Sequence, residues 1–196
     1  MSLARTVPVA ALGFIVGCTH NVAPKVTTAK IAAVQPPIRA RAILIITPSF
    51  ETYTTQSSQG IHHYNYQLGQ SAAAALQDLV ASSFDHGATQ RLSDAEVIRW
   101  LAAPADTSAA DLLLVPYFET GGVKKGLFTQ SADVRLRLDV RLYRGGVTYS
   151  WTAVGHTGRA ISSLRGLTGS ALEQALRGAA DSLGAHRGQL EGSAAQ

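Results

Sequence analysis

A long alternation of apolar and charged residues in the second half of the chain constrains the fold most. Over residues 133–143, valine or leucine occupies every second position, and the positions between carry Asp133, Arg135, Arg137, Asp139 and Arg141. Because successive side chains of a strand point to opposite faces of the sheet, this period of two predicts a half-buried antiparallel strand. Residues 144–146 predict a hairpin turn, and 147–154 alternate again. The chain must therefore build a sheet with one buried face and one charged face.

Three other stretches of the chain have the periodicity of amphipathic helices. Apolar residues recur every three to four positions over 68–86, 94–102 and 170–186, which predicts three amphipathic helices. Gly87 is the expected end of the first helix, and Ser93 is a suitable N-cap for the second.

Two further strands are predicted earlier in the chain. The apolar run 41–47 has the character of a strand buried on both faces, and 111–120 predicts another, with an edge, bulge or end at Pro116. The polar stretch 49–67 fits either a loop or an irregular hairpin. The resulting order, β-α-(β)-α-β-β-β-α, predicts an α/β (α+β) fold with helices packed on a mixed, partly antiparallel sheet.

The first eighteen residues indicate export. Arg5 is the one charged residue before Cys18, and the apolar stretch 7–16 has the length of a signal-peptide core. The stretch ends in Ile15-Val16-Gly17-Cys18, which resembles the lipobox of bacterial lipoproteins. The resemblance implies that residues 1–17 are a removed signal peptide and that Cys18, the only cysteine, carries covalent acyl chains such as palmitate. Thr19 in place of an aspartate implies the outer membrane, on its periplasmic side.

The composition of the mature chain suggests one domain between two flexible ends. Residues 18–40 hold three prolines and no clean periodicity, so we expect a tether able to reach roughly 70 Å at about 3.3 Å per residue. Residues 41–187 form the expected single domain, and 188–196 the expected disordered tail.

The predicted element order behind a lipobox resembles the TolB amino-terminal type of fold, which the periplasmic domain of the curli-secretion lipoprotein shares. The resemblance covers roughly residues 41–186, and it is carried by the strand ILIITP, the helix from Leu68-Gly69 to Phe84, the strand DLLLVPYFE and the hairpin RLDVRLYRGGVTYSWTAVG. It implies a protein-binding domain in an envelope apparatus for secretion, flagella or polysaccharide export.

Two groups of residues are candidates for partner contacts. In His62-His63-Tyr64-Asn65-Tyr66 the adjacent histidines of a strand would point to opposite faces, and no third ligand is suitably spaced, so we expect no metal site. His62, His63, Tyr64 and Tyr66 would instead lie in a solvent-facing loop or form an aromatic contact surface. The charged face with Arg135, Arg137, Asp139 and Arg141 is either a solvated face with cross-strand ion pairs or an interface.

No enzyme motif is visible. The chain lacks a G-x-S-x-G elbow, a phosphate-binding loop and a zinc-protease helix, so we expect no catalysis, metal or cofactor apart from the lipid. The mature chain would carry 16 basic and 13 acidic residues, too mild an excess to indicate nucleic-acid binding. We therefore expect a non-catalytic scaffold lipoprotein with an envelope protein partner, and homo-oligomerisation is plausible. The alternative is a small-molecule or lipid carrier with an apolar pocket between the helices at 68–84 and 170–186.

Overall fold

A computed structural model of the chain describes residues 18–28, 31–59, 61–102, 110–125, 130–142, 148–158 and 164–194. The predicted signal peptide with Ile15, Val16 and Gly17, and the predicted turn at 144–146, lie outside the described residues. None of the described helices is long and apolar enough to cross a membrane.

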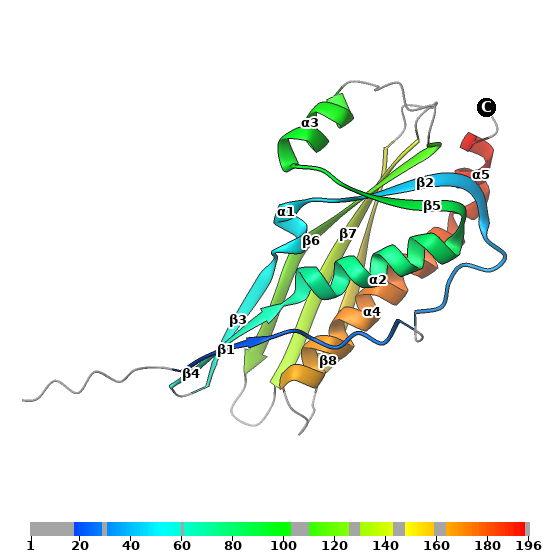
Figure 1. Ribbon diagram of the computed structural model, residues 1–196. Coiled ribbons are helices and arrows are strands. Elements are labelled where there is room, and N and C mark those ends of the chain that lie inside the picture. The colour runs from blue at the N-terminus through cyan, green and yellow to red at the C-terminus, as the bar shows by residue number, and fades with distance from the viewer. Residues whose placement is uncertain are drawn as a thin grey trace, which may run out of the picture.

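A five-stranded mixed sheet forms the centre of the molecule (Figure 1), in the order β5-β2-β6-β7-β8. Its strands are β2 (Ile38–Ile46), β5 (Phe84–Arg91), β6 (Leu112–Lys125), β7 (Gln130–Leu142) and β8 (Thr148–Gly158). Strand β2 pairs in parallel with both β5 and β6, whereas β6, β7 and β8 pair antiparallel. The predicted α+β class with a partly antiparallel sheet is confirmed.

Two long helices, α2 (Leu68–Ser83) and α4 (Leu164–Ala185), cover one face of this sheet (Figure 1). The apolar positions of β7 are buried in the core that these helices close, as the alternation predicts: Val134, Leu136, Leu138, Val140 and Leu142. The short α3 (Asp94–Ala102) packs Val97 against Ile45 and Val115, in a second apolar cluster separate from the main core. The sheet is therefore covered by long helices on one side and only locally by α3 elsewhere.

A second, three-stranded sheet projects from the body (Figure 1). It contains β1 (Cys18–Val22), β3 (Thr54–Gln59) and β4 (His62–Gln67), with β4 in the middle. We call this sheet the arm. Strands β3 and β4 follow the short helix α1 (Pro48–Glu51) along the chain and form an antiparallel hairpin. Strand β1 pairs with β4 in parallel. The polar stretch 49–67 is thus a hairpin rather than a loop.

The structure differs from the expected tether. Beyond β1, residues 23–28 and 31–35, which we call the strap, lie along α2 and α4. The amide of Thr27 donates to Glu173 Oε1 on α4 at 2.9 Å, and the amide of Val34 donates to Ser83 Oγ on α2 at 3.0 Å. Ile31 is only 8% exposed. These hydrogen bonds and scattered apolar residues hold the strap in place without any periodic pattern.

The expected disordered tail is also different. Residues Arg187–Ala194 form the helix α5, in which Leu190 is fully buried. The Arg187 guanidinium donates to Glu191 Oε1 at 2.9 Å and to the Pro37 carbonyl at 2.8 Å, which ties this helix to the start of β2. One buried leucine and these polar bonds order a segment whose composition suggested disorder.

The two predicted helix boundaries between α2 and α3 have different outcomes. The N-cap predicted at Ser93 is confirmed, whereas the helix end predicted at Gly87 is wrong. Ser93 and Glu96 form a capping box at α3, with the Ser93 amide donating to Glu96 Oε2 at 2.8 Å, and the Ser93 hydroxyl helps to lower the pKa of Glu96. Gly87 does not end the first helix, since α2 ends at Ser83 and Gly87 lies within β5. A Cβ there would lie 2.2 Å from the Val80 carbonyl oxygen, so glycine is needed for close helix–strand contact.

Candidate functional site

The lipobox cysteine lies at the free end of the arm. Cys18 is the first residue of β1, it is exposed, and it pairs with His62 next to the hairpin turn of β3 and β4. Its amide donates to the carbonyl oxygen of Ile61 at 3.1 Å. The side chain is thus accessible to modification while the backbone stays paired.

One face of the arm carries a row of aromatic rings. Rings of His20 and Tyr64 stack with centroids 5.1 Å apart, and His20 Nε2 lies 3.0 Å from His62 Nδ1. Tyr64 continues the row to Tyr66 at 6.4 Å. His63 lies on the opposite face, where its Nδ1 is 3.0 Å from Ser58 Oγ. The predicted His and Tyr cluster is therefore divided between two faces, as strand geometry requires.

His20 is the member of this row that sequence reasoning missed. Its contacts depend on the parallel pairing of β1 with β4, which brings residues 42 positions apart into contact. No local pattern around residue 20 announces that pairing.

Tyr66 is not available as a contact residue, contrary to the prediction. It is fully buried in the main core, where β4 enters the body. Its hydroxyl has no hydrogen-bond partner among the described residues. Burial raises the pKa of Tyr66 to about 12, with a smaller contribution from Tyr64.

Tyr66→Phe is expected to leave the free energy of unfolding unchanged or to raise it by about 1 kcal/mol, because it removes a buried hydroxyl without a partner. The raised pKa also means that the unfolded chain releases this proton at lower pH than the folded one. The wild-type protein should therefore lose stability as the pH rises from about 10 to about 12, and the variant should lose less. Urea unfolding at several pH values checks both, with Tyr64→Phe as control. A clear loss of stability at neutral pH would show that the hydroxyl has a partner.

The charged face of β7 lies opposite the long helices, and four of its five charged residues have partners within the molecule. Arg137 Nε lies 3.1 Å from Asp139 Oδ1, and the guanidinium lies over the Tyr117 ring at 4.7 Å. Asp139 also accepts from Ser150 Oγ on β8 at 2.6 Å. The Arg137–Asp139 pair lies along β7 itself, and the contacts to Tyr117 and Ser150 cross to the neighbouring strands. These contacts support the interpretation of a solvated face whose side chains are paired within the molecule.

At the far end of this face, Asp133 contacts His156 on β8, and its Oδ2 lies 3.5 Å from Lys124 Nζ on β6. The hydrogen bond from His156, together with the nearby charges, lowers the pKa of Asp133. Arg141 at the other end donates to the Trp100 carbonyl of α3 at 3.3 Å. The two ends of the charged row thus serve contacts within the molecule.

The middle of the face is more open. Arg135 is exposed, and its cross-strand neighbour on β8 is Val154, an apolar residue that is 54% exposed. Strand β8 is the last strand of the sheet. An exposed valine beside an exposed arginine on an edge strand is the part of this face best suited to contact another protein.

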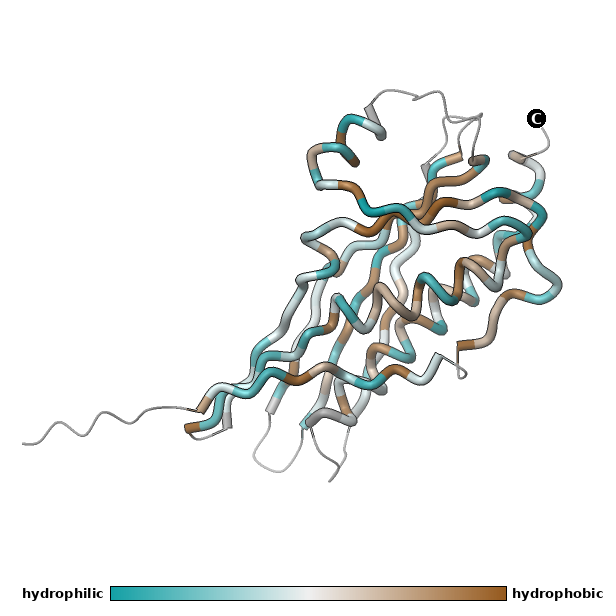
Figure 2. The backbone as a smooth tube through the Cα atoms, in the orientation of Figure 1, coloured by the Kyte–Doolittle hydropathy of each residue, from teal (hydrophilic) through white to brown (hydrophobic). Residues whose placement is uncertain are grey.

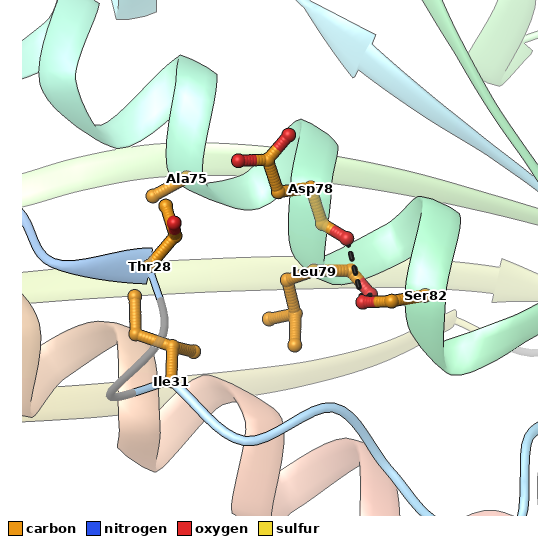
Figure 3. Close-up of a pocket in the computed structure, with 6 residues that line it drawn as sticks. All are labelled: Thr28, Ile31, Ala75, Asp78, Leu79 and Ser82. Carbon is orange, nitrogen blue, oxygen red and sulfur yellow. Dashed lines mark hydrogen bonds between the residues drawn. The ribbon is translucent and has the colours of Figure 1, made fainter.

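The strap lies along the two long helices, between which an apolar pocket was expected. A hollow of about 320 Å³ instead lies between the strap and α2 (Figure 3). It is lined by Thr28, Ile31, Ala75, Asp78, Leu79 and Ser82. Its lining is partly polar, and Asp78 and Thr28 are exposed. Such a partly open hollow gives a carrier function little support.

No group of three or more His, Cys, Asp or Glu side chains that could hold a metal ion occurs within the described ranges. The His20–His62 pair has no acidic or thiol group completing such a set in those ranges. What the arrangement offers is therefore an accessible cysteine, an aromatic arm and an open sheet face.

Comparison with known proteins identifies no family. No protein-family model matches the chain, and no curated protein matches it. Among solved structures, a putative neuraminyllactose-binding hemagglutinin homolog from Helicobacter pylori matches with a TM-score of 0.51 and 12% identity, over 84% of this chain and 95% of that one. This likeness shows a shared fold.

Two other solved structures match more loosely. A DUF330 protein from Xanthomonas campestris has a TM-score of 0.48 and 14% identity, over 88% of this chain and 98% of that one. The dodecamer-forming PelC from Paraburkholderia phytofirmans has a TM-score of 0.41 and 13% identity, over 75% and 91%. At these scores neither likeness supports a conclusion about this chain.

Proposed function

We propose that the protein is a lipoprotein of the outer membrane, anchored through acyl chains on Cys18 and facing the periplasm. The observation that carries this proposal is the coincidence of motif and structure. The only cysteine of the chain ends a lipobox-like sequence and is also exposed at the free end of the arm. A lipid attached there would project away from the body, and several acyl chains give a durable anchor.

Cys18→Ala is expected to abolish membrane retention, because it removes the one residue that can be acylated. The measurement is fractionation of the cell envelope, together with the intact mass of the detergent-extracted wild-type protein, which should show a chain beginning at Cys18 plus its lipid. Thr19→Ala is the matched control and should fractionate as wild type. Sedimentation of the Cys18→Ala protein with outer membranes would contradict the proposal.

We further propose that the anchored domain acts without catalysis as an assembly component of an envelope apparatus, with a TolB-like domain as its protein-binding part. Support comes from the open sheet face, where Arg135 and Val154 lie exposed on β7 and the edge strand β8. A partner, or a second copy, could contact this face without displacing a helix.

Arg135→Glu is expected to weaken that contact by about tenfold or more, since a reversed charge at an interface costs affinity and specificity. Light scattering of the detergent-extracted protein, with mass spectrometry of the proteins that co-purify, measures the effect. Arg99→Glu is the control, because Arg99 is an exposed arginine on the helix α3 rather than on β7 or β8. If both variants keep the wild-type mass and partners, the face is a solvated surface and the interface proposal is wrong.

A further inference from the structure

The arm differs from the rest of the molecule in charge. Residues 52–77 contain no Asp, Glu, Lys or Arg, and none occurs between Arg5 and Lys25 either. At the average charged fraction of the chain, 15%, a stretch of 26 residues would hold about four. Apart from Cys18 and Val22 of β1, the strands of the arm are built from Thr, Ser, Gln, Asn, His and Tyr, which have the pale to teal colours of Figure 2. The arm is thus polar and contains no Asp, Glu, Lys or Arg.

The tip of the arm combines this polarity with one exposed apolar side chain. Ile61, in the turn between β3 and β4, is 49% exposed, and its carbonyl accepts from the Cys18 amide. The stacked rings of His20 and Tyr64 lie on the adjoining strands β1 and β4. Amphipathic rings beside an apolar residue are typical of surfaces at the boundary between membrane and water.

Backbone pairing fixes the position of the arm's tip relative to Cys18. Each of the five residues of β1, from Cys18 to Val22, pairs with a residue of β4. A lipid on Cys18 therefore enters the membrane directly beside Ile61. The six residues of β4 span about 20 Å at about 3.4 Å per residue, so the body lies at most about that far from the membrane surface.

We infer that the tip of the arm, Ile61 with His20 and Tyr64, is a membrane-contacting surface that seats the anchored protein on the lipid headgroups. The inference rests on the proposed acylation of Cys18. The absence of charge favours a lipid surface, because no carboxylate is repelled by anionic headgroups and no charged side chain must be desolvated at the interface. The seating would hold the charged face of β7 at a fixed height, which a flexible tether would not.

The test uses the full-length, acylated protein reconstituted into vesicles of phosphatidylethanolamine and phosphatidylglycerol. Because Cys18 is the only cysteine and is acylated, Ile61→Cys introduces a single free thiol for an environment-sensitive dye. Ile98→Cys is the matched control, since Ile98 on α3 is also exposed, at 68%, but lies outside the arm. We expect a blue shift at position 61 and quenching by nitroxide-labelled lipid, and neither effect at 98.

The outcomes separate the inference from the proposal on which it rests. If the protein floats with the vesicles and the dye at 61 remains as water-exposed as the dye at 98, the anchor stands and the membrane contact is wrong. If the dye at 61 is shielded in native envelopes but not in protein-free vesicles, the tip contacts a protein and the inference is overturned. If the protein neither floats nor carries lipid, both the anchor and the inference fail.

Discussion

Gly155→Ala is expected to destabilise the domain by about 3 kcal/mol or more, at or above the upper end of typical overpacking costs. An ideal Cβ at this position of β8 would lie 1.7 Å from the Ala171 carbonyl oxygen and 2.8 Å from the Ala175 amide nitrogen of α4. Both atoms are backbone, so no side-chain rotation relieves the collision. The helix would have to move off the sheet and disturb the main core, which α4 closes.

Gly122→Ala is the matched control for this experiment. Gly122 lies on β6 of the same sheet, and a Cβ there would meet no atom within 4 Å. Alanine usually stabilises at such a site, because it restricts the unfolded chain, so we expect a change within about 0.5 kcal/mol of wild type. Urea unfolding followed by far-ultraviolet circular dichroism measures both variants. Equal stability of the two would show that α4 and β8 are farther apart than the structure places them.

The sequence predicts the strands and helices of the main body far better than it predicts the contacts between them. The alternation from Asp133 to Arg141 and the helical period at 68–86 predict β7 and α2 because each element has a single buried face. The requirement for glycine at Gly155 or Gly87 depends on how closely a helix approaches a strand, and no spacing within either element records that distance.

The candidate site also has one part that the sequence predicts and another that it does not. Cys18 is identified by a local motif, and the exposure of that residue in the structure adds to it. The arm around it depends on pairing between β1 and β4, and the burial of Tyr66 depends on where β4 meets the body. Periodicity and composition do not predict such non-local contacts, which is why residues 18–40 were expected to be a tether.

Removing β1 together with the strap as far as Val34 is the second change with a large expected effect. A Cys18→Ala chain that begins at residue 18 is the reference, and a chain that begins at Gln35 is the variant. The truncation removes the strand β1 and four apolar side chains that pack on the core: Val22, Val26, Ile31 and Val34. Burial of each such side chain contributes up to about 1.5–3 kcal/mol, offset by the entropy of ordering the strap. We expect a net loss of about 3 kcal/mol or more.

Thermal and urea unfolding of the two chains measure this loss, and binding of an apolar dye would report the uncovered surface of α2 and α4. Thr28→Ala is the control, because Thr28 belongs to the strap but is exposed, and it should change stability by less than about 0.5 kcal/mol. A truncated chain as stable as the reference would show that the removed residues do not stabilise the body, as expected for a flexible tether. It would also remove the basis for a body held near the membrane, since only a bound strap and a paired β1 fix the distance between Cys18 and the sheet.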